Sequence, residues 1–513
     1  MTLSESVSAA VAVLRRRPAD ILPFYLLGAA IPAIVRTVPF LGLFVGYLYL
    51  EWTGRLALLR AELEAGTLEP PDPEAEPDAF EAWADGLEPL VEQLVTPELA
   101  LGLAALGLVT VAATVAVGIV LFAATSAAQF SACYGRLRDD RGLIVGLAGA
   151  RRFWLRFVGL YVLEFVLWVL VGVVVVIGAT LFGAALVAVT GSEIATLAVV
   201  LPALLLAGLL LVVIRAVFAF APVAIVVDDA GVFDSLSRAA GFVRRRPVDA
   251  AFYYVLAVGS AVTLSVVTGI LAIVDVVSVG TLFATLVLFP FLDLLKTALY
   301  GSTRGRLSPP PMPVRSIRRQ FAGGLRRGWR EMLTFVRATP LLHAFVVVAA
   351  VASFWAGWVI AEPFVGTFET SVDARLEGHV PPAAAIELFG NNWTVAYTTA
   401  YAGLALAIPA FVSLAFNGFV MGIVVRLEVE LVELAAFVAP HGILEIPAIF
   451  VASALGLWLG IVGWRTVRGS AAPRDVVDAL ERAFWIVVGL GILLAVAAFI
   501  EGFVSPYYYE PFL

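Results

Sequence analysis

The sequence predicts an all-α, polytopic membrane protein with about eleven spanning helices and additional amphipathic helices at the membrane surface. Of its 513 residues, 61% are hydrophobic and only 14% are charged, and the mean hydropathy is +0.98. Soluble domains carry about 45–50% apolar and about 25% charged residues. Apolar runs of about 20 residues, enough for one crossing of a bilayer, recur along the chain. A water-soluble fold could not bury that much apolar surface.

Six spans are expected in the N-terminal 300 residues, and they would pair as three helical hairpins. Residues 19–60 are ambiguous because Pro32 and Pro39 could bend the helix or make it re-enter. The 155–190 run is long enough for one tilted helix or a broken one. The expected ranges are 21–50, 99–124, 155–190, 194–227, 248–274 and 276–300.

A repeated motif precedes several spans. The sequence Arg-Arg-Arg-Pro-Ala-Asp at 15–20 recurs as Arg-Arg-Arg-Pro-Val-Asp at 244–249. Apolar residues spaced three or four apart precede both copies, and the same spacing occurs before Pro340 and, more loosely, at 143–156. Each unit is predicted to be an interfacial helix, an arginine cluster, a proline and a span. Arginines at that depth reach lipid headgroups.

A linker at 301–325 is predicted to separate two membrane domains, 1–300 and 326–513. Its Ser-Pro-Pro-Pro-Met-Pro sequence at 308–313 cannot be helical throughout. Eight arginines and no acidic residue lie between Arg304 and Arg330. Such a basic run sets membrane topology, and it also suits anionic lipid headgroups.

The arginine clusters predict the orientation in the cell membrane, because cytoplasmic loops carry the excess of basic residues. Acidic loops at 62–98 and 362–387 alternate with the clusters. The N-terminus and the linker are therefore expected in the cytoplasm, and the C-terminus outside the cell. No cleavage site follows the first apolar segment, so it is expected to remain as an anchor.

Composition restricts the chemistry. Cys133 is the single cysteine, so no intrachain disulfide can form, and Lys296 is the single lysine. Few lysines and acidic loops indicate a salt-loving organism such as a haloarchaeon, or else codon bias in a high-GC bacterium. No P-loop, dinucleotide fingerprint or HExxH motif is present. We expect no cofactor and no nucleic-acid partner; metal binding is left open. The expected partners are the lipid bilayer and other membrane or envelope proteins.

Five spans are expected after the linker. Residues 412–440 are ambiguous, because the span at 412–427 is short and could be a re-entrant helix. The expected ranges are 340–361, 392–411, 412–427, 441–464 and 482–503.

Ionisable residues inside apolar helices are expensive and indicate a functional site. Pro440 can begin a helix, which would place His441 and Glu445 one turn apart on one face. Small residues follow on that face, so it is expected to pack against protein. Because successive spans alternate in direction, the start of this helix and the end of the last helix, with Glu501, are expected at the same depth in the membrane. We therefore predict a cluster of His441, Glu445 and Glu501, with Asn417 as a fourth member.

The C-terminal residues resemble the stage II sporulation protein M family over about 325–513. The resemblance is carried by Asn391-Asn392, Asn417-Gly418, the Pro-His-Gly-x-x-Glu-x-Pro-Ala sequence at 440–448, and Glu501. It implies about five spanning helices. The family's namesake works with peptidoglycan-degrading partners during engulfment, a role that cannot apply if the chain is archaeal.

Residues 1–300 loosely resemble the membrane domains fused to glycerophosphodiester phosphodiesterases. The likeness lies in the stretch from Phe220 to Ser235. No phosphodiesterase domain accompanies it, so the resemblance implies no such activity.

Other polar residues have structural interpretations. Asn391 and Asn392 are expected to open and cap a helix. Glu164 and Arg215 lie in adjacent spans and are expected to form an ion pair, since a buried charge needs a partner. Asp293 and Lys296 are expected to pair while the lysine reaches toward the interface.

These features favour a membrane scaffold or envelope-assembly component that acts through partners and is not an enzyme. One alternative is a transporter or channel for a small or lipidic substrate. Another is an intramembrane hydrolase that uses the His/Glu cluster. A continuous polar cavity reaching one face would favour transport, a metal bound at His441 and Glu445 would favour the enzyme, and lipid-packed helices with no cavity would favour the scaffold.

Overall fold

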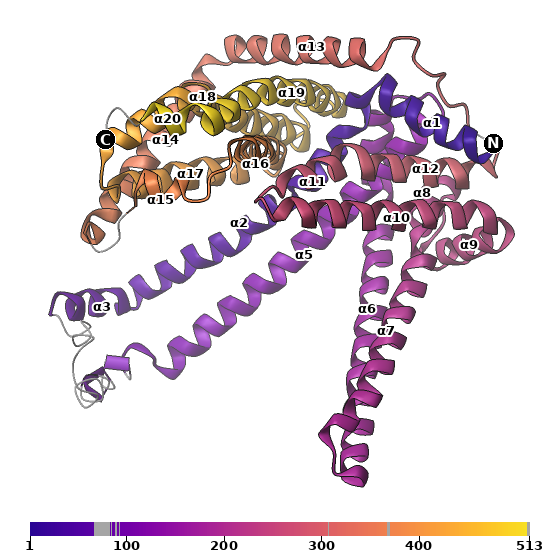
Figure 1. Ribbon diagram of the computed structural model, residues 1–513, viewed down its shortest axis with the longest axis horizontal. Coiled ribbons are helices and arrows are strands. Elements are labelled where there is room, and N and C mark those ends of the chain that lie inside the picture. The colour runs from indigo at the N-terminus through magenta and orange to yellow at the C-terminus, as the bar shows by residue number, and fades with distance from the viewer. Residues whose placement is uncertain are drawn as a thin grey trace. The chain divides into compact units, whose positions relative to one another are not determined.

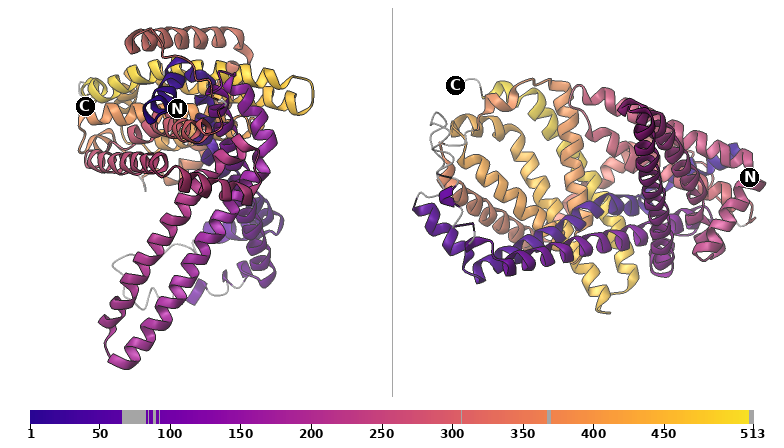
Figure 2. Two further views of the ribbon diagram at one scale, coloured as in Figure 1. Left: turned by 90° about the vertical axis from the view of Figure 1, so that its right-hand side faces the viewer. Right: turned by 90° about the horizontal axis from the view of Figure 1, so that it is seen from below.

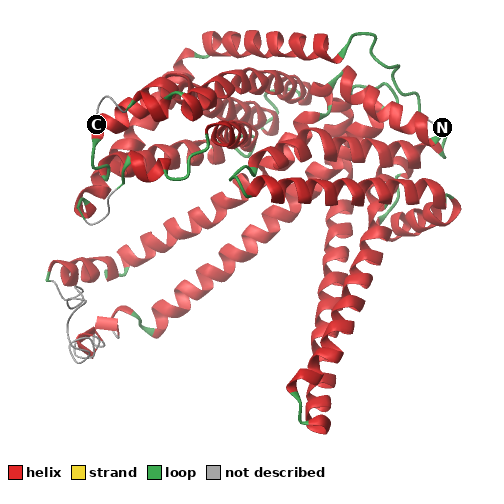
Figure 3. Ribbon diagram, viewed as in Figure 1, coloured by secondary structure: helices red, strands yellow, loops and turns green. Residues whose placement is uncertain are grey.

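The computed structural model describes residues 1–65, 83, 85–87, 90–91, 93–305, 307–366 and 370–509. Most of the acidic 62–98 loop therefore lies outside the described residues. The chain forms two compact units, one of Pro32–Ile119 and one of Met1–Ile31 with Val120–Leu513. Every regular element in the described ranges is helical (Figure 3), which confirms the all-α class.

Ten helical segments in the described ranges are long and apolar enough to cross a membrane. This agrees with a polytopic membrane protein. They are Leu22–Trp52 (α2), Pro97–Arg136 (α5), Gly142–Thr190 (α6), Glu193–Asp228 (η2, α7 and α8), Pro247–Ala272 (α10), Ser278–Ser302 (α11, η3 and α12), Pro340–Phe364 (α14 and η4), Ile408–Arg426 (α17), Leu431–Val467 (α18) and Pro473–Phe503 (α19).

Shorter helices connect or cover these segments, and several of the segments are themselves composite. The remaining bounds are α1 (Leu3–Arg16), η1 (Pro18–Asp20), α3 (Arg55–Glu64), η2 (Glu193–Thr196), α7 (Leu197–Ala219), α8 (Ala221–Asp228), α9 (Val232–Arg245), α11 (Ser278–Phe283), η3 (Ala284–Leu288), α12 (Phe289–Ser302), α13 (Ile317–Ala338), η4 (Glu362–Phe364), α15 (Val372–Leu376), α16 (Pro381–Ala402) and α20 (Ser505–Tyr508).

Two of the ambiguous N-terminal stretches form continuous helices. Leu22–Trp52 is one helix that contains Pro32 and Pro39. The 155–190 run lies in one unbroken helix, α6, and the expected interfacial segment at 143–156 is not separate, because it forms the start of that helix. In both views of Figure 2, α6 and α7 lie side by side along their length.

The interfacial helices share the way in which they end. The residues after α1, α9 and α13 are Arg17, Arg246 and Thr339, with φ of −145°, −129° and −129° and ψ of 69°, 56° and 49°. A proline follows each one. Proline disfavours α-helical geometry in the preceding residue but suits the first turn of the next helix. The repeated sequence therefore produces a repeated break between interfacial helix and following helix.

Helix α8 lies in the core of the N-terminal part. Its residues Ala221–Val227 are buried, and the Phe220 ring contacts Phe242 and Tyr253. At its end the Asp228 carboxylate accepts hydrogen bonds from Tyr300 Oη (2.6 Å) and from Arg304 Nε (2.8 Å). These bonds join α8 to α12, so the polar end of this stretch is structural.

Helices α14, α16, α17, α18 and α19 form the C-terminal bundle (Figure 1). Small residues allow close contact between backbones: a Cβ on Gly422 of α17 would lie 2.0 Å from the Phe354 carbonyl oxygen of α14. The expected short span at 412–427 is a 19-residue helix, Ile408–Arg426, which is long and apolar enough to cross a membrane. Pro440 does not begin α18, which begins at Leu431 and contains both Pro440 and Pro447.

The expected span at 392–411 is displaced. Helix α16 covers Pro381–Ala402, and the chain then turns through Leu406 and Ala407, whose φ values are 60° and 66°. Prolines at 381 and 382 suit the first turn of a helix, so the helix begins upstream of the apolar run. Asn391 and Asn392 therefore lie inside α16 and do not cap it; that prediction was wrong.

Candidate functional site

The antiparallel helices α18 and α19 bring three ionisable residues together. His441 and Glu445 come from α18, and Glu501 comes from the end of α19. His441 Nε2 lies 3.9 Å from Glu501 Oε1. One potential ligand atom from each of the three residues lies within 4.8 Å of the others. The structure thus places the three residues as one group.

Two residues position this group. Ser505 Oγ lies 2.9 Å from His441 Nδ1, and Asn392 Nδ2 donates to Glu445 Oε1 at 3.0 Å. Sequence reasoning missed both contacts. It treated Asn392 as a helix cap, and it did not consider Ser505, which follows the last long helix. The Asn391-Asn392 pair, in a helix that packs against α18, was the available signal for the contact between Asn392 and Glu445.

Aromatic residues pack beside His441. His441 is buried, and the Phe437 ring lies 5.6 Å from its imidazole ring, centroid to centroid. Tyr509 packs on Phe437, and its hydroxyl donates to Asp373 of α15 at 2.7 Å. Glu501 Oε2 is buried and has no hydrogen-bond partner among the described residues. His441 is thus the buried member of the group, whereas Glu445 and Glu501 are partly exposed.

Asn417 is not part of this group. Its side-chain amide donates to the Ser413 carbonyl oxygen in its own helix at 2.8 Å, on an exposed face. The adjacent Gly418 and Gly422 form the face of α17 that packs against α14. Because successive residues on a helix differ by about 100° in direction, Asn417 points away from the packed face.

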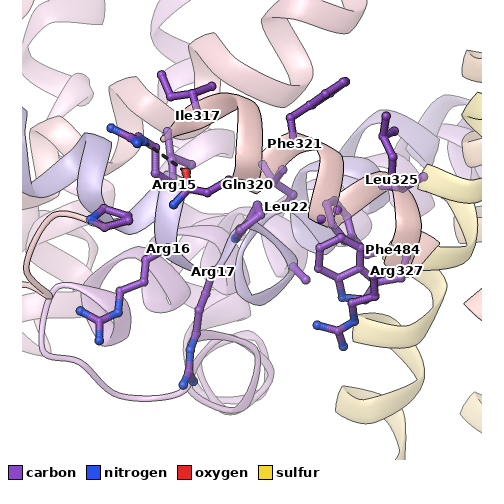
Figure 4. A pocket seen from close by; sticks show the side chains of 18 of the residues that line it. Arg15, Arg16, Arg17, Leu22, Ile317, Gln320, Phe321, Leu325, Arg327 and Phe484 are labelled. Atoms are coloured by element: carbon purple, nitrogen blue, oxygen red, sulfur yellow. Dashed lines mark hydrogen bonds between the residues drawn. The ribbon is translucent and has the colours of Figure 1, made fainter. Parts of the chain in front are cut away.

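A second candidate site is a cavity of about 1880 Å³ bounded by α13, α19, α16 and the start of the chain. Figure 4 shows Arg15, Arg16 and Arg17 on one side and Phe484 with Arg327 on the other, below the helix that carries Ile317, Phe321 and Leu325. The cavity is lined by both basic and apolar residues. Basic lining residues are Arg15, Arg16, Arg17, Arg141, Arg315, Arg319 and Arg327; apolar ones include Leu22, Val287, Phe389, Trp393, Phe484, Trp485, Val488, Ile492 and Val496.

Most of these arginines lack a carboxylate partner. Arg141 and Arg327 both bind Glu481, at 3.1 and 3.2 Å. Within the described part of the chain, the other five cavity arginines have no carboxylate oxygen within 4.0 Å. Arg15 and Arg16 instead donate to the carbonyl oxygens of Arg315 and Pro311. The cavity therefore carries an excess of positive charge.

A third polar region lies in the N-terminal part. Arg215 Nη1 and Glu164 Oε1 are 3.1 Å apart, and both residues line a cavity of about 660 Å³. Asp293 and Lys296 line the same cavity and are paired at 3.0 Å. Lys296 does not reach toward the interface as expected. It is 7% exposed, and its amine lies 4.5 Å from the centre of the Phe130 ring.

Both the N-terminal and the C-terminal part of the chain match a known protein family. Residues 24–304, more than half of the sequence, match a family of unknown function, DUF7544. The chain belongs to DUF7544. In this DUF7544 protein, residues 344–506 match stage II sporulation protein M. This match confirms the resemblance of the C-terminal third and, with the apolar helices, indicates a multi-pass membrane protein.

The function of the family matched by residues 24–304 is unknown. The likeness of residues 1–300 to phosphodiesterase-linked membrane domains therefore stays a resemblance. No curated protein and no solved structure matches the DUF7544 chain.

Proposed function

We propose that this protein of the stage II sporulation protein M type binds an anionic lipid of the cytoplasmic leaflet in the cavity beside α13. The observation that carries the proposal is the five arginines with no carboxylate partner among the described residues, which line a cavity of about 1880 Å³ whose other lining residues are largely apolar. A lipid has the matching chemistry, with an anionic headgroup for the arginines and acyl chains for the remainder.

The arginine geometry favours a phosphate-bearing headgroup. A guanidinium group offers several N–H donors in a plane and binds phosphate oxygens bidentately. Arg15, Arg16 and Arg17 are consecutive, and Arg315 of the linker and Arg319 of α13 line the same cavity. The cavity also exceeds the roughly 300–1,000 Å³ of ordinary small-molecule pockets. Its size therefore suits a ligand with acyl chains.

Helix α13 covers the cavity with only part of its length. Toward its C-terminal half it packs tightly on α19: a Cβ on Gly328 would lie 2.9 Å from the Gly489 nitrogen. Near its N-terminal end, Ile317 and Phe321 are each 67% exposed. Apolar side chains exposed next to a basic cavity can pack against acyl chains or the interfacial region of a bilayer.

This proposal selects the lipidic-substrate alternative over a scaffold that acts only through partners. The scaffold hypothesis predicted helices packed without a cavity. A cavity of this size, open to a basic surface, supports binding of a lipid, whether the lipid is then moved or held.

The duplicated motif provides a matched test. In one variant Arg15, Arg16 and Arg17 are changed to Gln; in the control Arg244, Arg245 and Arg246 are changed to Gln. Both variants lose three charges from the same sequence motif, but only the first set lines the cavity. At about 1 kcal/mol per basic residue, the first variant should bind anionic lipid at least about tenfold more weakly.

Binding is measured on the purified full-length protein by native mass spectrometry with phosphatidylglycerol and phosphatidylcholine. The proposal predicts a preference for the anionic lipid that falls in the first variant and remains in the control. Equal affinity for both lipids, or equal losses in the two variants, would contradict it.

A further inference from the structure

We propose that His441, Glu445 and Glu501 bind one divalent transition-metal ion, with Zn²⁺ as the reference ion. This site is separate from the lipid cavity. Imidazole nitrogen and carboxylate oxygen are both ordinary zinc ligands, and three protein ligands are typical of zinc sites that keep an open coordination position.

The donor spacing fits a metal with small adjustments. Tetrahedral zinc with bonds of about 2.0–2.2 Å places its donor atoms about 3.3–3.6 Å apart. The three donors here lie within 4.8 Å of one another, and the His441–Glu501 pair is at 3.9 Å. Side-chain rotations of the glutamates that move their oxygen atoms by up to about 1.5 Å would therefore close the site.

Neighbouring residues orient the ligands in the manner of metal sites. In such sites the second ring nitrogen of a ligand histidine bonds to another protein group, which fixes the ring. Ser505 occupies that place at His441 Nδ1, which leaves Nε2 facing Glu501. Asn392 fixes Glu445 by donating to one carboxylate oxygen, and the other oxygen is left for a ligand.

The charge of the group also requires a cation. Two carboxylates close together in a helical bundle at membrane depth repel each other and lose their hydration. No arginine or lysine pairs with Glu445 or Glu501 among the described residues, and Glu501 Oε2 is buried without a hydrogen-bond donor. A divalent ion would balance both charges and occupy that oxygen.

The test uses the purified full chain after treatment with a chelator. Zn²⁺ binding is measured by titration and elemental analysis, and Co²⁺ replaces Zn²⁺ for absorption spectroscopy. We expect about one ion per chain and the intense visible bands of four- or five-coordinate Co²⁺. Glu501→Gln, which keeps the side-chain shape, should weaken binding at least about 100-fold. Ser505→Ala should weaken it about 10- to 100-fold.

Control substitutions are His343→Gln and Glu433→Gln, because His343 binds Thr339 within α14's first turn and Glu433 lies on α18 outside the group. Both should leave the stoichiometry and affinity unchanged. If the wild-type chain takes up no stoichiometric ion, or if its Co²⁺ spectrum is that of the free hydrated ion, the site does not exist. Equal weakening by the controls would also overturn the assignment. The wild-type spectrum decides the question even if a variant does not fold.

Discussion

At the scale of single residues, Asp20 caps a helix that is distant in sequence. Its carboxylate oxygens accept the backbone N–H groups of Gly142 (2.8 Å) and Leu143 (3.0 Å), the first residues of α6. Arg136 lies 3.5 Å from the same carboxylate, and its side chain is only 2% exposed. One acidic side chain therefore serves as helix cap and as the counterion of a buried arginine.

Replacing Asp20 by Ala should lower the free energy of unfolding by about 1–3 kcal/mol. The substitution removes a helix cap and one of the two carboxylates beside the buried Arg136, which keeps Asp139 Oδ1 at 3.4 Å. Denaturation in mixed micelles measures the loss. The control is Asp140→Ala, because Asp140 pairs with Arg138 at 3.7 Å on the surface, where a pair contributes less than about 1 kcal/mol. Equal losses would contradict the double role of Asp20.

Asp229 gives a pH-dependent contribution to stability. A hydrogen bond from Arg156 (2.6 Å), together with nearby Arg152, lowers the pKa of the Asp229 carboxyl below its ordinary value. Because the pKa is lower in the folded protein, the stabilisation is complete above the ordinary aspartate pKa of about 3.9. It is lost as the pH falls from there through the folded-state pKa.

The variant Arg156→Gln removes the largest cause of this shift, so its melting temperature should fall less between about pH 4 and pH 2 than that of the wild type. Melting curves at several pH values provide the measurement. Arg151→Gln is the control, because Arg151 has no ion-pair partner in the described part of the chain. An identical acid dependence in all three proteins would exclude the contribution.

The sequence indicated part of the candidate site. Spacing placed His441 and Glu445 on one helical face, and parity placed Glu501 at their depth. Ser505 and Asn392 could not be predicted, because their contacts depend on where α16 begins and how the chain turns after α19. Asn417 was wrongly included because depth alone does not tell which face of a helix is buried.

At the scale of elements, α14 and α17 depend on glycine. A Cβ on Gly422 would lie 2.0 Å from a backbone oxygen of α14, whereas a Cβ on Gly172 of α6 meets nothing within 4 Å. Gly422→Ala should therefore destabilise the protein by about 1–3 kcal/mol through overpacking. Gly172→Ala should be neutral or stabilise it by up to about 1 kcal/mol. Thermal unfolding of both variants distinguishes a packing effect from the general effect of replacing glycine.

The ion pair of Glu164 and Arg215 couples α6 to α7. In a double-mutant cycle with Glu164→Leu and Arg215→Leu, the destabilisations caused by the two single changes should add up to more than that of the double change. The difference, which is the coupling energy, should be roughly 1 kcal/mol. The Arg215 side chain is 60% exposed in the structure, which keeps the expected value modest. Additive effects on unfolding would show that the two side chains do not stabilise each other.

Element boundaries were harder to predict than element types. Hydropathy located the apolar runs, but prolines proved a poor guide to helix ends: Pro440 lies inside α18, and Pro32 lies inside α2. Packing against neighbouring helices compensates for the hydrogen bond that an internal proline removes. The predicted span at 392–411 was displaced from α16 because the polar residues in the first half of α16 lower its hydropathy, so the helix start was not recognised.

At the scale of the whole molecule, α16 decides which side of the membrane holds the C-terminus. It is not among the ten segments selected by length and composition, yet it runs antiparallel along α19. Gly502 lies against Pro381 at one end, and the Tyr401 hydroxyl lies 3.4 Å from the Leu480 carbonyl oxygen at the other. Its 22 residues extend about 33 Å, enough to cross the hydrocarbon core. If α16 crosses the membrane, the described ranges contain eleven spans.

We therefore expect the C-terminus and the 62–98 loop outside the cell and the 304–330 segment inside. Single cysteines at Asp72, Arg315 and Tyr507, in a Cys133→Ser background, are labelled in intact cells with an impermeant maleimide. Labels should appear at 72 and 507 only. Labelling at 315 but not at 72 would reverse the orientation, and a C-terminus protected while 72 reacts would remove α16 from the spans.

The burial of Lys296 makes its amine a single-site chemical probe. No other side chain in the sequence carries a primary amine, and this one lies on the wall of the 660 Å³ cavity beneath the Phe130 ring. Side-chain labelling by an amine-reactive reagent can therefore occur only where that cavity admits it. The rate of acylation would measure how often the N-terminal helices part, in the native membrane and without any engineered residue.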